Sequence, residues 1–100
     1  MPKITVLMPC FDARETLGVA LDSLLSQEGA DFEVLAVDDG SKDDTLDILE
    51  SHAKRDSRVR PLAREHGGIV AALNAGLEAA QGDYVVAALD FFRKQPLDRL

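Results

Sequence analysis

The chain has 100 residues, of which 46% are hydrophobic and 29% charged, a balance typical of one ordered globular domain. Its formal net charge of −7 argues against nonspecific binding to nucleic acids or anionic membranes, because both are negatively charged. Cys10 is the single cysteine, which excludes an internal disulfide and fits a reducing compartment. The first residues contain too short an apolar run for a signal peptide, and no segment approaches the ~20 apolar residues of a membrane-spanning helix. We therefore expect a cytoplasmic location.

The first half of the chain predicts two strands with a helix between them. A β-rich run at residues 4–8, stopped by Pro9, predicts the first strand. Asp12 has the spacing of a capping box before a stripe of leucines at helical intervals, and Gly29 ends this helix. The continuous apolar run at residues 32–37 is typical of a strand buried on both faces.

The second half continues the same alternation. A second helix is predicted over residues 43–54, followed by a short strand at residues 59–62. Pro61 places this strand at a sheet edge, because proline cannot donate to the hydrogen-bond ladder. A third helix covers residues 69–80, and a fourth strand covers residues 84–89.

The order β-α-β-α-β-α-β predicts the α/β class, with a three-layer Rossmann-like open parallel sheet in one domain spanning residues 1–100. Right-handed crossovers with one reversal of winding give the strand order 3-2-1-4. Asp12, Asp38, Asp39 and Asp90 all fall at carboxyl ends of predicted strands. Open α/β sheets bind ligands in the crevice at that edge, so we interpret these acids as parts of a site.

Asp38 and Asp39 follow the buried second strand directly and precede a Gly-Ser turn. Side chains in a strand alternate sides, so both cannot point into the core, and at least one is expected to face the crevice. An unpaired buried carboxylate is costly, which predicts a counter-charge, a metal or a hydrogen-bonding ligand. A solvated acidic loop that caps the next helix is the alternative.

The pattern V-D-D-G-S-x-D-x-T at residues 37–45 resembles the nucleotide-sugar-binding segment of family 2 inverting glycosyltransferases of the GT-A fold. Residues 66–76 are similar to the family's N-x-G-x-x-x-A-x-N-x-G segment, and residues 95–100 are similar to its P-x-R-L. The resemblance implies the nucleotide-binding half of a GT-A fold. It also implies a nucleotide-diphosphate sugar as donor, with a UDP-sugar expected, and transfer of that sugar to an acceptor hydroxyl.

The resemblance assigns roles to individual residues. Asp39 would accept a hydrogen bond from the nucleobase, and Asp38 would have a structural or ribose contact. Phe11 matches the aromatic position of a base- and ribose-contacting loop, P-x-Y/F-N, in which Asp12 replaces the usual Asn; apart from the resemblance, Asp12 is a helix N-cap. Asn74 either supports the nucleotide site or ties its helix to a strand end. The complete set of expected nucleotide-binding residues is Pro9, Phe11, Asp12, Asp38, Asp39, Asn74 and Asp90.

The metal site and the catalytic base depart from the family pattern. The family's fourth strand ends in D-x-D, whose last Asp helps to coordinate Mn²⁺ or Mg²⁺, but here Asp90 is followed by Phe92 at that position. Phenylalanine offers no ligand, so metal use is doubtful, although Arg93 offers an alternative counter-charge for phosphate. In the family the catalytic base lies beyond the position of Leu100, so the resemblance implies a truncated chain without that base.

Cys10, His52 and His66 are of residue types that often act in catalysis. We interpret Cys10 as a small buried hydrophobe at a strand end. His66 is expected to be a loop histidine and not a base, and His52 a surface residue.

The sequence leaves one alternative function open, argues against two other domain classes, and predicts one assembly. A non-catalytic nucleotide-binding or protein-interaction module would explain Phe92 and the missing half. A receiver-like domain needs its paired acids after the first strand, and a dinucleotide-binding domain needs G-x-G-x-x-G there; neither is present. The apolar fourth strand predicts a homodimer through its open edge, with a covering tail at residues 91–100 as the alternative.

Overall fold

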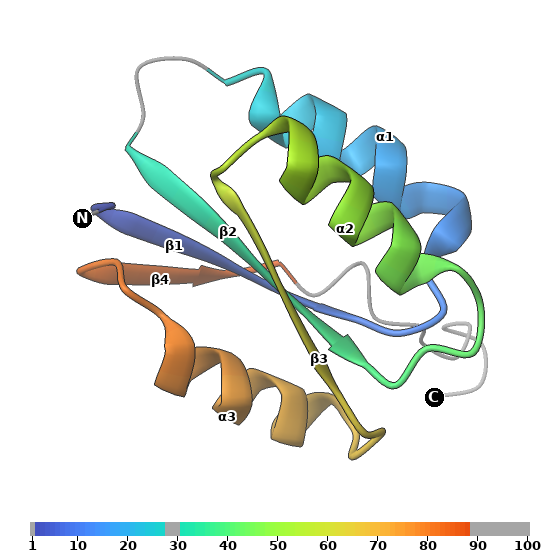
Figure 1. Cartoon of the computed structure of the whole chain (residues 1–100). Coiled ribbons are helices and arrows are strands. Elements are labelled where there is room, and N and C mark those ends of the chain that lie inside the picture. The colour runs from blue at the N-terminus through green and yellow to red at the C-terminus, as the bar shows by residue number, and fades with distance from the viewer. Residues whose placement is uncertain (1, 28–30, 89–100) are drawn as a thin grey trace, which may run out of the picture.

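The computed structural model describes residues 2–27 and 31–88, which form a four-stranded sheet and three helices (Figure 1). In chain order the elements are β1 (Ile4–Cys10), α1 (Arg14–Leu25), β2 (Phe32–Asp39), α2 (Thr45–Arg55), β3 (Val59–Arg64), α3 (Ile69–Ala79) and β4 (Tyr84–Ala87). The strand order is β3-β2-β1-β4 and every neighbouring pair is parallel. The predicted α/β class and strand order are confirmed. None of the described helices is long and apolar enough to cross a membrane.

Helices cover both faces of the sheet, with α1 and α2 on one face and α3 on the other (Figure 1). The core is accordingly divided into two clusters. The cluster under α1 and α2 includes Met8, Leu17, Leu21, Val34, Ala36 and Leu49, and the cluster under α3 consists of Leu7, Leu35, Val37 and Ala72. Alternate residues of β2 therefore enter opposite clusters, which explains its continuous apolar run.

The third helix approaches the sheet closely through a glycine. A Cβ atom on Gly76 would lie 2.1 Å from Cδ1 of Leu7 in β1, a distance that no real side chain tolerates. Any larger residue at this position would push α3 away from the strand or force Leu7 to move.

Strands β1 and β2 each extend two residues beyond their predicted ends. Pro9 lies inside β1 opposite Val37, and the pairing continues from Cys10 to Asp38. A proline removes only its own N–H from the ladder, and β2 stays in register with β1 on both sides of that position. Asp38 and Asp39 are consequently strand residues, and not the first residues of the following turn.

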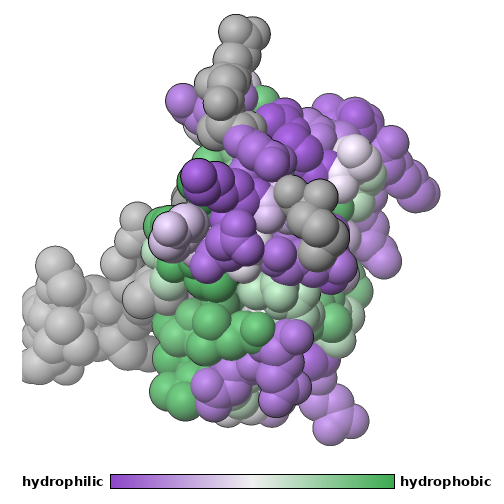
Figure 2. All heavy atoms as spheres, turned by 90° about the vertical axis from the view of Figure 1, so that its left-hand side faces the viewer, coloured by the Kyte–Doolittle hydropathy of each residue, from purple (hydrophilic) through white to green (hydrophobic). Residues whose placement is uncertain are grey.

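The two edges of the described sheet differ in character. β3 is an edge strand, as Pro61 predicted, and Pro61 lies opposite Ala36 of β2. β4, at the other edge, exposes 63% of Tyr84 and 54% of Val86. Figure 2, which looks at the side where β4 begins, shows hydrophobic residues gathered in one area of the surface.

The expectation that His52 is a surface residue is wrong. Its side chain is buried between α2 and α1, where Nδ1 lies 2.9 Å from the Ile48 carbonyl oxygen and Nε2 lies 3.0 Å from Oδ1 of Asp22. The ring satisfies both nitrogens at once, and this is why a polar residue fits the inner face of α2.

Candidate functional site

Three loops meet at the carboxyl edge of the sheet, after β1, β2 and β3. The Asp12 N–H donates to Ser41 Oγ at 2.9 Å, and the Lys42 N–H donates to Asp12 Oδ1 at 2.8 Å, so the first two loops are tied reciprocally. The third loop packs directly on the second: Gly40 has a φ of +75°, and a Cβ there would lie 2.6 Å from the backbone nitrogen of His66. The three loops form one continuous structure around the end of β2.

Asp38 and Asp39 lie on opposite faces of the sheet, as strand alternation requires, but neither faces an open crevice. Asp38 is 3% exposed and Asp39 is 0% exposed. The Ser41 hydroxyl donates to Asp38 Oδ1 at 2.5 Å, on the α1–α2 side. At least one carboxylate was expected to face the crevice; the structure buries both, because the loops after β1 and β3 pack over the strand end.

Asp39 is held by the loop that joins β3 to α3. The N–H groups of Gly67 and Gly68 donate to its two carboxylate oxygens at 3.0 and 2.9 Å. Arg64 Nε lies 3.4 Å from Oδ1, and His66 Nδ1 lies 2.9 Å from Oδ2. The buried charge is therefore compensated by two backbone donors and two basic side chains.

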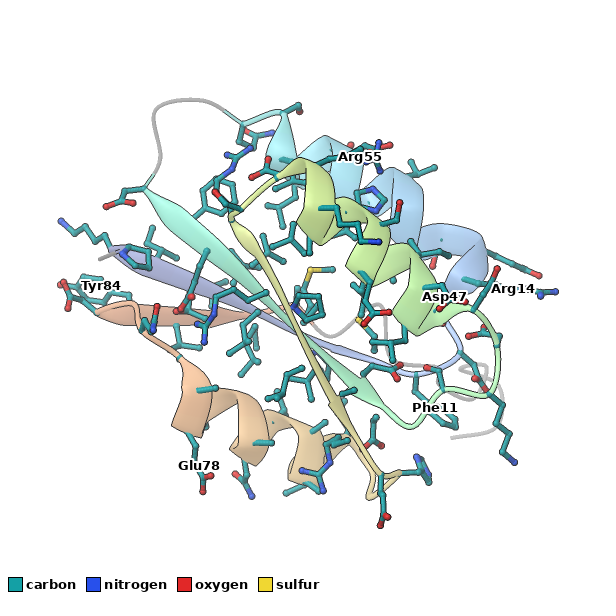
Figure 3. The ribbon with its side chains drawn as sticks, viewed as in Figure 1. Phe11, Arg14, Asp47, Arg55, Glu78 and Tyr84 are labelled. Carbon is teal, nitrogen blue, oxygen red and sulfur yellow. The ribbon has the colours of Figure 1, made fainter. Side chains whose placement is uncertain are left out.

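An aromatic pair spans the top of this strand end. Phe11, which follows β1, and His66, which follows β3, stack with ring centroids 4.4 Å apart and an interplanar angle of 29°. Figure 3 places Phe11 in the loop beyond the end of β1. Because β2 lies between β1 and β3 in the sheet, the two rings meet over Asp39.

The N-cap role predicted for Asp12 is wrong. The N-cap position of α1 is Ala13, and its N–H donates to Thr45 Oγ1 at 2.9 Å. Asp12 has a φ of +49° and directs Oδ1 to the second loop instead. Asp43 accepts bonds from the Thr45 N–H and hydroxyl and from the Arg14 N–H. Burial alone would raise the pKa of Asp43, but these hydrogen bonds outweigh it and hold the pKa below its usual value.

Cys10 behaves as the buried hydrophobe that the sequence predicted. Burial, with a smaller contribution from the charge of Asp38, raises the pKa of the Cys10 thiol to about 12. A thiol with this pKa is not a nucleophile at neutral pH. Pro9, the preceding residue, is fully buried within β1, so it offers no surface to a ligand.

The remaining predicted residues lie apart from this cluster or outside the described part of the chain. Asn74 is exposed on the second turn of α3. Asp90 and Phe92 fall outside the described residues. Among residues 2–27 and 31–88, no group of three or more His, Cys, Asp or Glu side chains is arranged to hold a metal ion. An open cavity of about 560 Å³ lies beside the first two loops, lined by Asp12, Arg14, Glu15, Lys42 and Asp43.

Comparison with known proteins identifies the class. The family described as Glycosyl transferase family 2 matches residues 5–90, and the chain belongs to this family. It is 38% identical over 100 residues to the Putative teichuronic acid biosynthesis glycosyltransferase TuaG of Bacillus subtilis, covering 99% of this chain and 39% of TuaG. It is 35% identical over 85 residues to the Uncharacterized glycosyltransferase EpsJ of the same organism, covering 85% of this chain and 25% of EpsJ.

A solved structure supports the GT-A fold. The mannosyltransferase PcManGT from Pyrobaculum calidifontis, solved in complex with GDP-Man and Mn²⁺, superposes with a TM-score of 0.76 at 27% identity. The match covers 88% of this chain and 27% of PcManGT. The chain thus spans between about a quarter and two fifths of the length of these relatives.

The sequence did not reveal how the loops are held together. Ser41 and Thr45 bind the loop after β1 through their hydroxyls, and Gly67 and Gly68 bind Asp39 through their backbone. In the sequence, Ser41 and Thr45 cannot be distinguished from ordinary turn residues. The adjacent glycines are the one signal that could have indicated a close approach of backbone to a charged group.

Proposed function

We propose that this chain forms the donor-binding part of an inverting glycosyltransferase that uses a nucleotide-diphosphate sugar, with UDP as the first candidate nucleotide. The observation that carries the proposal is the set of three loops closed around Asp38 and Asp39, at the sheet edge where open α/β proteins bind ligands. Membership of the family supports it, as does the GDP-Man bound by the structural neighbour.

The proposed reaction divides between this chain and a catalytic base elsewhere. An acceptor hydroxyl oxygen attacks the anomeric carbon, the bond from that carbon to the diphosphate oxygen breaks, and a base takes the hydroxyl proton. We place that base outside residues 1–100, in agreement with the small share of the relatives that the chain spans. The residues described here would bind and orient the nucleotide, which departs as the leaving group.

Divalent metal use is proposed to be weak in this chain. A hard cation such as Mn²⁺ needs oxygen ligands. Phe92 stands two residues after Asp90, at the position where the family's D-x-D pattern has its second Asp. When bound, such an ion would neutralise the charge that develops on the diphosphate. Asp90 would be its protein ligand.

Calorimetric titration with UDP and with GDP, each with Mn²⁺ and with a chelator, tests the proposed function. We expect a nucleoside diphosphate to bind with little dependence on Mn²⁺, and the Phe92→Asp variant to gain Mn²⁺-dependent affinity. Tight binding of UDP that requires Mn²⁺ in the unaltered chain would contradict the metal proposal. No binding of either nucleotide would contradict donor binding and favour an interaction module.

We also propose that this chain pairs with a second copy through β4. The strand pairs with β1 on one side only among the described residues, and its exposed side chains are apolar. An open apolar edge of this kind favours strand pairing between molecules.

A further inference from the structure

We propose that Ser41 is a positioning residue for the nucleotide site, and that it acts by holding the backbone of Asp12 in a left-handed conformation. This inference rests on the proposed nucleotide-binding function. It gives Asp12 a role through its backbone, where the resemblance counted the residue among those expected to bind the nucleotide.

The Ser41 hydroxyl joins the loops after β1 and β2. It accepts a hydrogen bond from the Asp12 N–H at 2.9 Å and donates its own hydrogen to Asp38 Oδ1 at 2.5 Å. A hydroxyl has one hydrogen, a backbone N–H only donates and an ionised carboxylate only accepts, so both bonds have one possible direction. Asp38 is 3% exposed and is paired in the sheet with Cys10. The two bonds therefore tie the loop after β1 to a rigid strand.

Asp12 has a backbone conformation that a residue with a Cβ seldom adopts. Its φ of +49° lies in the left-handed region, and among the described residues it is the one non-glycine residue with a positive φ. The second loop holds this conformation from two sides, because Asp12 donates to Ser41 through its N–H and accepts from the Lys42 N–H through Oδ1 at 2.8 Å. The next residue is held as well, since the Ala13 N–H donates to Thr45 Oγ1.

The conformation of Asp12 determines where Phe11 lies. Cys10 is fixed on one side of Phe11 as the last residue of β1, and Ser41 fixes Asp12 on the other side. The Phe11 ring then packs on His66 with the centroids 4.4 Å apart. The loop that carries Phe11 is the one that the resemblance assigns to base and ribose contacts. With another φ at Asp12 the chain would leave Phe11 in a different direction, and the ring would move away from the strand end.

Substitutions of Asp12 separate this role from a direct contact of its carboxylate, with UDP and GDP titrated by calorimetry. Glycine lacks the carboxylate but adopts a positive φ without strain, whereas alanine and valine lack the carboxylate and disfavour the conformation. Asp12→Ala and Asp12→Val should bind roughly 5- to 30-fold more weakly than Asp12→Gly, the fold-change that corresponds to the cost of one left-handed residue. Equal losses in all three variants would show that the carboxylate is the contact and would overturn the proposal.

Removal of the Ser41 hydroxyl tests the positioning residue itself. Ser41→Ala should weaken nucleotide binding roughly 5- to 30-fold in the unaltered chain, because Asp12 loses the partner that holds its conformation. The loss should be less than about twofold in the Asp12→Gly background, because glycine does not depend on the hydroxyl for this conformation. Ser51→Ala, the same change at an exposed position of α2, is the matched control and should bind normally.

Urea unfolding of each variant verifies that the titrated protein is folded, so that a change in affinity does not reflect unfolded chains. Normal binding by folded Ser41→Ala, or an equal loss in both backgrounds, would overturn the proposal. If Ser41→Ala does not fold, the three substitutions of Asp12 decide the question alone. Failure of the unaltered chain to bind either nucleotide would overturn the proposed function itself.

Discussion

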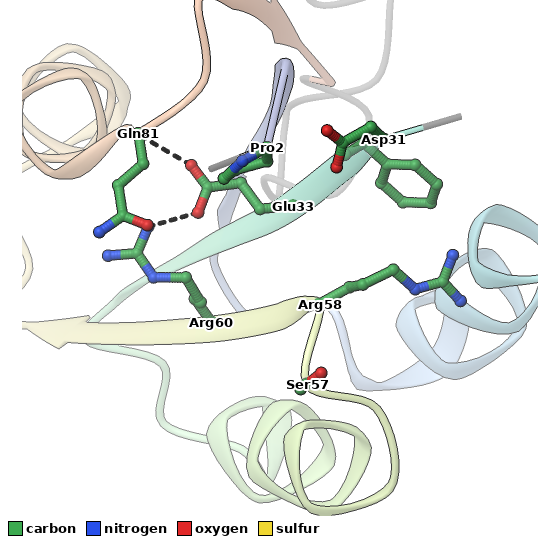
Figure 4. Close-up of a pocket in the computed structure, with 8 residues that line it drawn as sticks. Pro2, Asp31, Glu33, Ser57, Arg58, Arg60 and Gln81 are labelled. Carbon is green, nitrogen blue, oxygen red and sulfur yellow. Dashed lines mark hydrogen bonds and ion pairs between the residues drawn. The ribbon is translucent and has the colours of Figure 1, made fainter. Parts of the chain in front are cut away.

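The two ends of the sheet each bury a carboxylate, and they do so by different means. At the amino end, Glu33 is 3% exposed and accepts hydrogen bonds from the Gln81 N–H at 2.8 Å and Arg60 Nη1 at 2.5 Å (Figure 4). The Thr5 hydroxyl also donates to it, at 2.5 Å. At the carboxyl end, Asp39 is bound by a single loop. Both charges are compensated, so burial of a carboxylate does not by itself indicate a ligand site.

The difference lies in what the partners are attached to. Thr5 and Arg60 belong to β1 and β3, and Gln81 lies in the loop between α3 and β4, so Glu33 connects two other strands and this loop. The cavity beside it, of about 350 Å³, is lined in part by Glu33 and Arg60, which bind each other, and by Arg58, which binds Asp56. Asp39 instead orders the loop that carries an exposed aromatic ring. We infer that the amino end serves stability and the carboxyl end serves binding.

The largest effect is expected at Glu33. Glu33→Ala should lower the free energy of unfolding by about 3–5 kcal/mol, because it leaves a cation, a hydroxyl and a backbone N–H without their common acceptor. Urea unfolding measures it, with Glu50→Ala on the exposed face of α2 as control, expected within about 0.5 kcal/mol of the unaltered chain. A change at Glu33 no larger than the control would refute the structural role.

Asp39 should have the next largest effect, on nucleotide binding. Asp39→Ala is expected to weaken UDP binding by about 1.5–3 kcal/mol, roughly ten- to hundredfold, because the loop that holds His66 loses its charged acceptor. Calorimetry with UDP measures the change, after the folded state has been verified by the unfolding transition. Unchanged affinity would remove Asp39 from the site altogether.

The sequence was sufficient for the fold but only partly for the site. The apolar run of β2 and the alternating elements predicted class and strand order, because periodicity reports which faces are buried. The sequence could not reveal that Asp38 and Asp39 are covered, since the cover comes from Phe11 and His66, which are 27 or 28 positions away. Asp12 looked like an N-cap by spacing, yet Thr45 of another loop satisfies the Ala13 N–H that begins the helix.

Acid should destabilise the amino end through Glu33. Burial alone would raise the pKa of Glu33, but hydrogen bonds from Thr5, Gln81 and Arg60 outweigh it and lower the pKa below its ordinary value of 4.5. The folded pKa is below the unfolded one, so the unfolded state binds more protons, and the stabilisation is present above pH 4.5 and lost as the pH falls through the folded pKa. Urea midpoints between pH 7 and pH 3 should fall less steeply for Glu33→Gln; an identical slope would contradict the assignment.

The smallest effect is expected at the β4 edge, as weak self-association. Tyr84, Val85 and Val86 are 63%, 39% and 54% exposed. Among the described residues β4 pairs on one side only, and two copies paired antiparallel about a two-fold axis would satisfy the other side of both strands at once. A charged side chain opposes such pairing, so Val86→Lys should shift sedimentation toward the monomer, while Val19→Lys, at a 74% exposed position on α1, should leave it unchanged. A monomer at high micromolar concentration in the unaltered chain would show that the edge is blocked. Equal effects of the two lysines would show instead that association depends on net charge and not on the strand.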